Sequence, residues 1–409
     1  MINVIGLGYI GLPTALMLSA SGNEVIGTDI NNEIVDMLNK GKLPIEEKGL
    51  PELYQNALNK GVKFSSEYIT TDTYIITVPT PYIKDNKKID PQYIISAVKR
   101  ILEIINQDIT IVIESTVSPG TIDKYIRPII DDFQVDNSNY KIDLVHAPER
   151  ILPGNMIYEL KNNSRTIGCD EPKSGLKIKK VYETFCDSEI IITDIRTAEM
   201  SKVVENTFRD INIAFANELT KIARHDNLDV YEIIRIANKH PRVNILNPGP
   251  GVGGHCISVD PWFLVGDYPE HTDLIKQARI INDGMPAFTL NRVKEIMEEN
   301  NLKDLEKVGL YGLAYKSDVD DIRESPTLQL LEAQRKSLGA ELKTFDPFIT
   351  KKITENQYFD FENFLNDIDL LIIMVSHSHI LAEDNLNKIK DKIILDTQHK
   401  IELENVYYL

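Results

Sequence analysis

Cysteine is scarce in this sequence, and long apolar runs are missing. Three cysteines are spread over 409 residues. Their odd number and wide spacing argue against a disulfide framework and predict a reducing, cytoplasmic location. No run of about 18 apolar residues occurs, which disfavours a membrane-spanning helix. The first residues, MINVIGLGYIG, lack the basic segment of a signal peptide and predict a strand instead.

Positive charge is also in deficit. The formal net charge is −17, which disfavours nucleic acid and anionic membranes as partners because both require a basic surface. An anionic small ligand would need a local concentration of lysine and arginine. The chain is long enough for two or three domains that each contain a full hydrophobic core.

The N-terminal segment predicts a dinucleotide-binding unit. After an apolar run at residues 2–5, Gly6, Gly8 and Gly11 match the pattern G-x-G-x-x-G. The first glycine makes a tight turn, the second leaves room for the pyrophosphate, and the third allows a helix to pack closely on a strand. A second strand, EVIGT, ends at Asp29, whose carboxylate can accept both ribose hydroxyls and would repel a 2′-phosphate. The pattern therefore predicts NAD as the cofactor.

Strands and helices then alternate as in a doubly wound α/β domain. Strands are expected at residues 73–78, 109–114 and 142–146, and a helix at 91–105. Ligands of parallel sheets bind at the carboxyl ends of the strands. The residues that follow these ends are Pro79, Thr80, Ser115, Thr116, Glu149 and Arg150. Capping and turn stabilisation are the alternative roles for such side chains.

A long helix is predicted at residues 197–226, which contain no proline or glycine and repeat apolar residues at helical spacing. Such a helix would span roughly 45 Å. Helices of this length commonly link lobes or form subunit interfaces, so a homodimer is expected. The apolar stripe expected to be buried consists of Val203, Val204, Phe208, Ile211, Phe215 and Leu219.

The same helix carries a polar stripe. Lys202, Asn206 and Arg209 follow at spacings of four and three, which places them on one face. A solvated polar face is the ordinary explanation of such a stripe. A lysine and an asparagine one turn apart can instead bind a sugar hydroxyl and stabilise an alkoxide as hydride leaves. We favour this functional interpretation.

The stretch at 247–263, NPGPGVGGHCISVDPWF, combines a cysteine with a glycine-rich loop. The glycines allow positive φ and a close approach of the backbone to a ligand. Exposed amides of such a loop can stabilise the thiolate of Cys256 and later an oxyanion. Asp260 is placed to handle a proton or a water beside the sulfur. The alternative is a structural turn with a buried, inert thiol.

A second, smaller α/β unit is predicted towards the C-terminus. Its strands are expected at residues 307–311, 341–345, 369–375 and 392–396, without a complete glycine fingerprint. Lys316 and Arg323 in its loops suit phosphate groups, although exposed basic residues are common. His377 and His379 form an H-x-H pair that lacks a third ligand at suitable spacing, so no metal site is predicted.

Taken in order, these motifs resemble those of the UDP-glucose/UDP-mannuronate dehydrogenase family of nucleotide-sugar 6-dehydrogenases. The resemblance covers nearly the whole chain and rests on GLGYIG, VPTP, ESTVSPGT, HAPER, AEMSKVVENTFRDINIAFANE, GPGVGGHCISVDPW and GLAYKSDVDDIRESP. His255 and Val259 look most like the branch that oxidises UDP-N-acetyl-D-mannosamine, since the UDP-glucose branch typically has serine and lysine there. The segment after the last predicted strand, at 396–399, lacks an arginine that some relatives place near the nucleotide.

The resemblance implies a Rossmann-type NAD domain (1–195), a central long-helix dimerisation segment with the cysteine loop (196–300) and a C-terminal UDP-binding domain (301–409). It also implies two successive NAD-dependent oxidations of a primary alcohol to a carboxylate. Cys256 would attack the intermediate aldehyde to give a thiohemiacetal and then a thioester. The oxyanions would be stabilised by Lys202 and Asn206, with proton transfer by Asp260 and Lys202. Glu149 and Thr116 would position or activate the hydrolytic water.

Two sets of ligand contacts follow from the resemblance. The cofactor would contact Gly6, Gly8, Tyr9, Ile10, Gly11, Asp29, Pro79, Thr80, Ser115, Thr116 and Arg323. The UDP-sugar would contact Glu149, Arg150, Lys202, Asn206, Arg209, Arg242, Asn244, Gly253, His255, Tyr315 and Lys316, with Arg242 reaching into the neighbouring subunit's site.

Three alternatives remain open on the sequence. The sugar nucleotide could be UDP-N-acetyl-D-glucosamine or UDP-glucose, because a pocket that separates such sugars depends on geometry. A one-step 3-hydroxy acid dehydrogenase also combines an NAD domain with a helix bearing lysine and asparagine four apart, but it needs neither a catalytic cysteine nor a second α/β domain. A catalytically inactive nucleotide-sugar sensor would not need Cys256, Lys202, Asn206 and Asp260 together.

Overall fold

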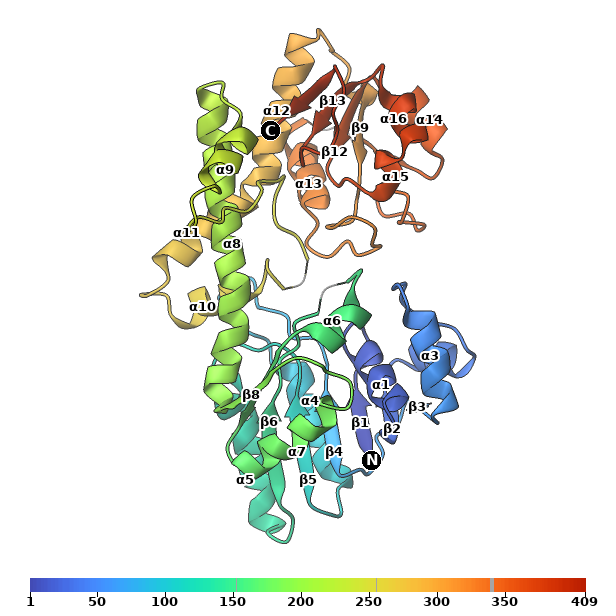
Figure 1. Ribbon diagram of the computed structural model, residues 1–409, viewed down its shortest axis with the longest axis vertical. Coiled ribbons are helices and arrows are strands. Elements are labelled where there is room, and N and C mark those ends of the chain that lie inside the picture. Colours follow the sequence, from blue (N-terminus) through green and yellow to red (C-terminus); the bar gives the residue numbers. More distant parts are fainter. Residues whose placement is uncertain (152, 255, 339–341) are drawn as a thin grey trace. The chain divides into compact units, whose positions relative to one another are not determined.

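A computed structural model describes residues 1–151, 153–254, 256–338 and 342–409 (Figure 1). The chain forms two compact units, Met1–Glu205 and Asn206–Leu409. None of the helices in the described ranges combines the length and apolar character that crossing a bilayer requires.

An eight-stranded sheet forms the centre of the first unit, in the order β3-β2-β1-β4-β5-β6-β7-β8. All neighbouring strands run parallel except β6 and β7, which are antiparallel. Strands β1, β4 and β5 are buried along their whole length and are rich in isoleucine, as expected for parallel strands covered on both faces. The strands are β1 (Ile2–Ile5), β2 (Val25–Thr28), β3 (Lys63–Ser65), β4 (Thr73–Ile76), β5 (Ile109–Ile113), β6 (Ile142–His146), β7 (Arg165–Cys169) and β8 (Ile190–Thr193).

The helices of this unit begin where local chemistry favours them. The Asn31 side chain accepts a hydrogen bond from the Glu33 N–H at the start of α2, and α3, α5 and α7 have proline in the first turn. The helices are α1 (Gly11–Ala20), α2 (Asn32–Asn39), α3 (Leu50–Asn59), α4 (Gln92–Ile104), α5 (Arg127–Asp136), α6 (Met156–Asn162) and α7 (Pro172–Tyr182), with a π-helical turn, Ile122–Ile126, before α5.

The predicted long helix is α8 (Ile195–His225), which starts in the first unit and ends in the second. Its predicted buried stripe is partly wrong. Val203 is buried, but Val204, Phe208 and Phe215 are 47%, 66% and 49% exposed, and the exposed apolar positions continue at Ile222. Helical periodicity marks an apolar face without saying whether the same chain covers it.

A fully parallel six-stranded sheet forms the centre of the second unit, in the order β11-β10-β9-β12-β13-β14. Its strands are β9 (Val308–Tyr311), β10 (Lys343–Phe345), β11 (Gln357–Tyr358), β12 (Leu370–Ile373), β13 (Ile393–Asp396) and β14 (Val406–Tyr408). The expected strand at 341–345 is thus found from Lys343 onward, while Glu341 lies outside the described residues.

Short and medium helices complete the second unit. They are α9 (Val230–Ala237), α10 (Asp260–Asp267), α11 (Asp273–Asp283), α12 (Met285–Glu299), α13 (Pro326–Leu338), α14 (Phe361–Asn366), α15 (Ser378–Leu381) and α16 (Glu383–Ile389), with a 3₁₀ turn at Leu305–Lys307. The larger N-terminal α/β sheet, the central long helix and the smaller C-terminal parallel sheet confirm the predicted fold class.

Candidate active site

The glycine loop between β1 and α1 has three glycines with three different surroundings. Gly6 has φ +92°, and a Cβ there would lie 3.0 Å from the Thr77 carbonyl oxygen. A Cβ on Gly11 would lie 1.8 Å from the Gly6 carbonyl oxygen, so the start of α1 packs directly on the loop. A Cβ on Gly8 would meet nothing within 4 Å. The loop therefore leaves open space at the position where a pyrophosphate approaches in dinucleotide-binding loops.

Asp29 links the end of β2 to this loop. Its Oδ2 accepts a hydrogen bond from the Leu7 N–H at 2.7 Å, and its Oδ1 accepts one from the Asn31 N–H at 2.8 Å. Each carboxylate oxygen has further lone pairs, so Asp29 can still accept hydrogen bonds from ribose hydroxyls.

The remaining cofactor candidates of the first unit stand at the next strand ends. The Thr80 hydroxyl donates to the Thr116 carbonyl oxygen at 2.7 Å, and the Ser115 hydroxyl donates to the Val78 carbonyl oxygen at 2.6 Å. The loops after β4 and β5 are therefore joined. Strand order reverses between β1 and β4, and ligands of open α/β sheets bind beside such a reversal.

The cysteine loop of the second unit packs on a tyrosine. Cβ atoms on Gly253 and Gly254 would lie 2.6 and 2.8 Å from Tyr315 side-chain atoms, so only glycine fits at both positions. The Gly254 N–H donates to the Arg323 carbonyl oxygen at 2.9 Å. Burial, Asp321 and Cys256 together raise the pKa of Tyr315. These contacts bring Cys256, Tyr315 and Arg323 into one neighbourhood.

Asn206 and Asp260 meet beside the cysteine. The Asn206 amide donates to Asp260 Oδ2 at 2.6 Å, and both residues are buried. Asp260 is the first residue of α10, and its N–H donates to the Cys256 carbonyl oxygen at 2.8 Å. Cys256 itself is partly exposed and is not part of a disulfide bond. Two residues from distant parts of the sequence thus meet at the turn that carries the thiol.

Lys202 lies one helical turn before Asn206 and is also buried, at 7% exposure. Within the described parts of the chain, its ammonium group has no ion-pair or hydrogen-bond partner. Arg209, Arg242 and Asn244 are exposed. The structure therefore separates Arg209 from the buried pair, although all three residues belong to the predicted stripe.

Other predicted residues have their own partners. Arg150 donates to the Ser164 and Thr166 hydroxyls, each at 3.0 Å, and pairs with Glu205 at 2.7 Å. Arg323 donates to both carboxylate oxygens of Asp321. Tyr9, Ile10, Thr116 and Lys316 are partly buried, Pro79 is exposed, and His255 lies outside the described residues.

Sequence reasoning missed the polar groups that anchor the cysteine loop. Asn217 of α8 accepts from the Gly249 N–H at 2.9 Å and donates to Asn282 of α11 at 2.8 Å. Asn282 donates in turn to Asp210, which pairs with Arg279 at 2.6 Å. All four side chains are buried. The sequence contained one signal for these groups: Asp210 and Asn217 are polar residues within the predicted long helix, and buried polar side chains require hydrogen-bond partners.

Two other residues that the sequence did not single out lie against Glu149. Arg165 contacts Glu149 at 2.5 Å and Glu114 at 3.1 Å, and all three side chains are at most 5% exposed. Glu114 is an acid at the end of an otherwise apolar strand. This is the pattern that could have identified it.

The H-x-H pair contributes to loop structure in the second unit. His377 Nε2 lies 3.2 Å from Asp346 Oδ2, which also accepts hydrogen bonds from the Leu313 and Ala314 N–H groups. Burial opposes ionisation of Asp346, but its hydrogen bonds lower its pKa. Among the described residues, no three acidic, histidine or cysteine side chains are grouped as a metal site.

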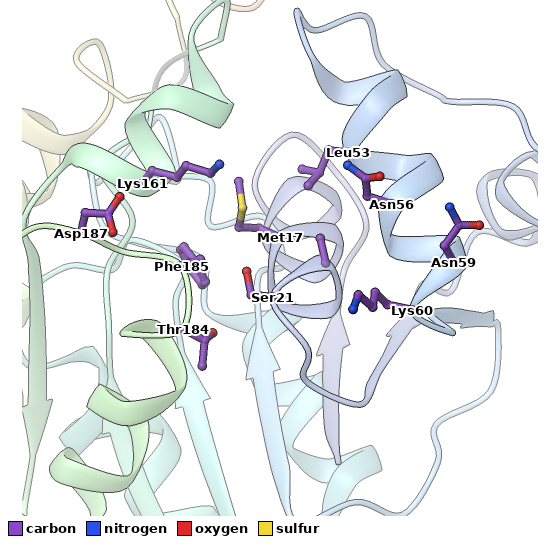
Figure 2. Close-up of a pocket in the computed structure, with 11 residues that line it drawn as sticks. Met17, Ser21, Leu53, Asn56, Asn59, Lys60, Lys161, Thr184, Phe185 and Asp187 are labelled. Carbon is purple, nitrogen blue, oxygen red and sulfur yellow. The ribbon is translucent and has the colours of Figure 1, made fainter.

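A pocket of about 620 Å³ lies on the first unit, away from the glycine loop (Figure 2). Met17, Ala20 and Ser21 line it at the C-terminal end of α1, whereas the glycine loop precedes the N-terminal end of that helix. The side chains of Lys60 and Lys161 reach it from opposite sides. This pocket is therefore separate from the cofactor candidates.

Known proteins resemble the chain along its whole length. A relative in Methanocaldococcus jannaschii named UDP-N-acetyl-D-mannosamine dehydrogenase is 42% identical over 410 residues, which cover 98% of this chain and 92% of the relative. A relative in Ralstonia nicotianae named NDP-N-acetyl-D-galactosaminuronic acid dehydrogenase is 39% identical, with 97% and 95% covered. The solved structure of a UDP-N-acetyl-mannosamine dehydrogenase from Staphylococcus aureus is 41% identical, with a TM-score of 0.87 over 100% of this chain and 97% of that one.

Sequence profiles of one family match in three consecutive stretches. These are the NAD binding domain at residues 1–186, the central domain at 196–284 and the UDP binding domain at 309–402. The glycine loop and Asp29 lie within the first of these stretches. The chain is therefore an NAD-dependent UDP-sugar dehydrogenase that belongs to the UDP-glucose/GDP-mannose dehydrogenase family.

Proposed function

We propose that the enzyme oxidises UDP-N-acetyl-D-mannosamine at C6 to the uronate in two NAD-dependent steps, with Cys256 as the covalent nucleophile. The buried 2.6 Å hydrogen bond between Asn206 and Asp260 is the observation that carries this proposal. It joins the helix residue expected to stabilise an oxyanion to the acid expected to transfer a proton. The names of the relatives from M. jannaschii and S. aureus favour the mannosamine substrate.

The residues of the first unit fit a bound NAD. Gly8 leaves space for the pyrophosphate, the N-terminus of α1 favours its negative charge, and Asp29 is available for the ribose hydroxyls. Bound by these residues, NAD would supply the hydride acceptor for each oxidation. We assign the surrounding contacts to Gly6, Tyr9, Ile10, Gly11, Pro79, Thr80, Ser115, Thr116 and, from the second unit, Arg323.

Lys202 and Asn206 have the chemistry to stabilise negative charge on oxygen. A buried ammonium group and an amide one turn apart stabilise an alkoxide or oxyanion more strongly than the same groups in water. Cys256 Sγ adds to the aldehyde carbonyl to form a thiohemiacetal, and after the second oxidation the acyl group remains on this sulfur as a thioester. Asp260 exchanges protons with Lys202 through a water molecule.

Hydrolysis of the thioester requires a group that accepts a proton from water. We assign this role to Glu149, with Thr116 orienting the water. The diphosphate and the sugar also need local positive charge in a chain of net charge −17. We assign this binding role to Arg150, Arg209, Arg242 and Lys316, with Asn244, Gly253, His255 and Tyr315 as further contacts.

A homodimer through α8 is part of the proposal. Val204, Phe208, Phe215 and Ile222 follow at spacings of four, seven and seven and are 47–66% exposed. They extend over about 27 Å of helix. A contiguous apolar stripe with heptad-like spacing suits a second copy of the same helix. Arg242, which is exposed, would extend into the partner's site.

We also keep the three-part division at 1–195, 196–300 and 301–409, which the matched stretches of the family profiles support. A cytoplasmic location stays a prediction, which rests on the odd number and wide spacing of the three cysteines.

Counting NADH per molecule of UDP-sugar tests the reaction. Two NADH and one uronate per UDP-N-acetyl-D-mannosamine are expected, whereas one NADH would refute the two-step oxidation. Parallel assays with UDP-N-acetyl-D-glucosamine, UDP-N-acetyl-D-galactosamine and UDP-glucose test the sugar. The name of the Ralstonia relative makes the galactosamine derivative a necessary comparison. A higher kcat/KM with any of these three would refute the mannosamine assignment.

Substitution of the thiol tests the covalent mechanism. Cys256→Ala should abolish uronate formation while UDP-sugar binding is retained. Cys186→Ala is the matched control, because Cys186 is also a free thiol but is buried in the core of the first unit. Wild-type turnover by Cys256→Ala would rule out Cys256 as the nucleophile.

A further inference from the structure

Glu114, Glu149 and Arg165 form a buried cluster in the N-terminal sheet, beside the carboxyl ends of β5 and β6 and the first residue of β7. Arg165 Nη1 lies 3.1 Å from Glu114 Oε1, and Arg165 Nη2 lies 2.5 Å from Glu149 Oε2. The guanidinium also packs over the Tyr182 ring, with its carbon 4.5 Å from the ring centre. One cation is thus shared by two carboxyl groups that are both buried.

The reversal of strand direction between β6 and β7 explains this arrangement. In the antiparallel register, Val145 pairs with Cys169 and His146 with Gly168. Continuing this register past the end of β6 places Arg165 opposite Glu149. If β7 ran parallel to β6, its first residue would lie beside the amino end of β6, far from Glu149. Glu114 follows β5 directly and lies one strand away from Glu149.

The charges in this cluster do not balance if both carboxyl groups are ionised. Two negative charges then face one positive charge, and two carboxylates in one site resist ionising together. The buried Oε2 atom of Glu114 and the Tyr182 hydroxyl also have no hydrogen-bond partner among the described residues. One proton on the pair reduces the charge and supplies a missing donor.

We propose that Glu114 is a positioning residue that holds a proton beside Glu149, so that Glu149 alone is charged against Arg165 at neutral pH. The inference rests on the hydrolytic role of Glu149 proposed above. Glu114 touches Arg165, Glu149 and Tyr182, and it acts on the reaction through Glu149. During hydrolysis, Glu149 takes one proton from the attacking water as its oxygen adds to the thioester carbonyl. The C–S bond then breaks, Cys256 leaves as a thiolate, and the new carboxyl group loses the second proton of the water to solvent. The first proton is released to solvent as the pair returns to its singly protonated form.

The electrostatics of the cluster agree with its geometry. Burial raises the pKa of Glu114 to about 8, with Arg165 opposing the increase and Glu149 adding to it. Burial and Glu114 also raise the pKa of Tyr182, which keeps its hydroxyl protonated. The three charged or titratable groups that face Glu114 come from β7, from the segment after β6 and from α7.

Infrared spectroscopy of the whole enzyme tests the shared proton independently of turnover. The wild-type-minus-Glu114→Gln difference spectrum at pH 7 should contain the carbonyl band of a protonated carboxyl group, and this band should disappear as pH rises through about 8. Absence of this band at pH 7 would overturn the inference. The control is Glu199→Gln, because burial raises the pKa of Glu199 to about 7 at a different place in the unit.

The pH dependence of thioester hydrolysis in single-turnover experiments tests the link to Glu149. We expect the wild type and Glu199→Gln to show a step near pH 8 that Glu114→Gln lacks, while KM for the UDP-sugar is unchanged. Identical profiles for wild type and Glu114→Gln would overturn the inference and leave the proposed function intact. Absence of any thioester in the wild type would overturn the covalent mechanism, and the infrared band would still report the proton.

A conservative variant keeps the test usable if Glu114→Gln does not fold. Glu114→Asp retains a titrating group but withdraws it from Arg165 and Glu149 by one methylene group. It should restore a protonated carboxyl band and a step in the profile at a shifted pH. A Glu114→Asp profile without any step would count against the inference, because a structural role alone predicts no titration at this position.

Discussion

The glycine loop combines two expected roles, close packing within the protein and space for the pyrophosphate of NAD. Alanine substitutions, each of which adds one methyl group, can test these roles separately. Gly11→Ala places a Cβ 1.8 Å from the Gly6 carbonyl oxygen and 2.2 Å from the Thr77 hydroxyl oxygen. Gly8→Ala places its Cβ in open space, and Gly8 does not have a positive φ. We therefore predict that Gly11→Ala destabilises the fold, whereas Gly8→Ala leaves the fold intact and weakens only NAD binding.

The sizes of the two effects follow from these distances. At Gly11 the clash involves backbone, which cannot rotate away, so the cost lies at the upper end of about 1–3 kcal/mol for an overpacked site. A cost of about 3 kcal/mol lowers Tm by roughly 6–12 °C in a unit of this size. Gly8→Ala should change stability by less than about 0.5 kcal/mol. Its methyl group fills the space for the pyrophosphate, so we expect NAD affinity to fall by about tenfold or more, or about 1.4 kcal/mol.

Two measurements on each variant without cofactor test whether Gly8→Ala affects NAD binding and Gly11→Ala affects stability. Thermal unfolding followed by circular dichroism gives the stability of the folded chain, and titration with NADH followed by its fluorescence gives the affinity. A Gly8→Ala variant that unfolds like Gly11→Ala would show that the space beside Gly8 is needed by the protein itself. A Gly8→Ala variant that binds NADH like the wild type would refute the assignment of this space to the pyrophosphate.

Lys202→Ala should lower kcat by about 10²–10³ with little change in KM, because the ammonium group is expected to stabilise charge that develops in the reaction; a change confined to KM in steady-state kinetics would contradict this role. If the proposed homodimer forms through α8, Phe208→Asp should be monomeric in analytical ultracentrifugation, since the Phe208 side chain is 66% exposed on the apolar stripe of α8. A variant that is as dimeric as the wild type would rule out that interface. Burial lowers the pKa of His146 from 6.5 to about 4. Between pH 6.5 and pH 4 the unfolded chain therefore binds more protons than the folded chain, and the free energy of unfolding falls as pH falls. From pH 7 to pH 5 the wild type should lose about 2 kcal/mol more than His146→Gln in urea unfolding, and equal losses would show that His146 is not the sensitive group.

Local patterns in the sequence predicted most elements that have strong periodicity or clear ends. β6 was predicted at its observed bounds, and α8 within two residues at each end. β7 was missed because it starts with Arg165. A charged residue is typical of a loop, and here it is stabilised by carboxyl groups that follow two other strands. The start of α10 was also missed, because the glycines and Pro261 indicate a loop although proline is common in a first helical turn.

Within the candidate site, the close packing at Gly6 and Gly11 was predictable, because only glycine fits such positions. The role of Cys256 stays a prediction. The site was less predictable where a side chain's role depends on distant partners. Asn217 and Asn282 anchor the cysteine loop through contacts over 65 residues of sequence separation, and a single sequence contains no record of such pairs. The exposed stripe of α8 is the opposite case: its apolar pattern was visible in the sequence, but helical periodicity alone does not predict that this face is exposed in the single chain.

Asp29 has a consequence for engineering a different nicotinamide cofactor. A redesign towards NADP would normally remove this acid to make room for a 2′-phosphate. Here the same carboxylate also holds the Leu7 amide of the glycine loop at 2.7 Å. Replacement by alanine or arginine would leave that amide without its acceptor, so the loop would loosen before the new selectivity could appear. A successful switch must therefore keep an oxygen at this position, for example as asparagine, and place the phosphate-binding cation on a neighbouring residue.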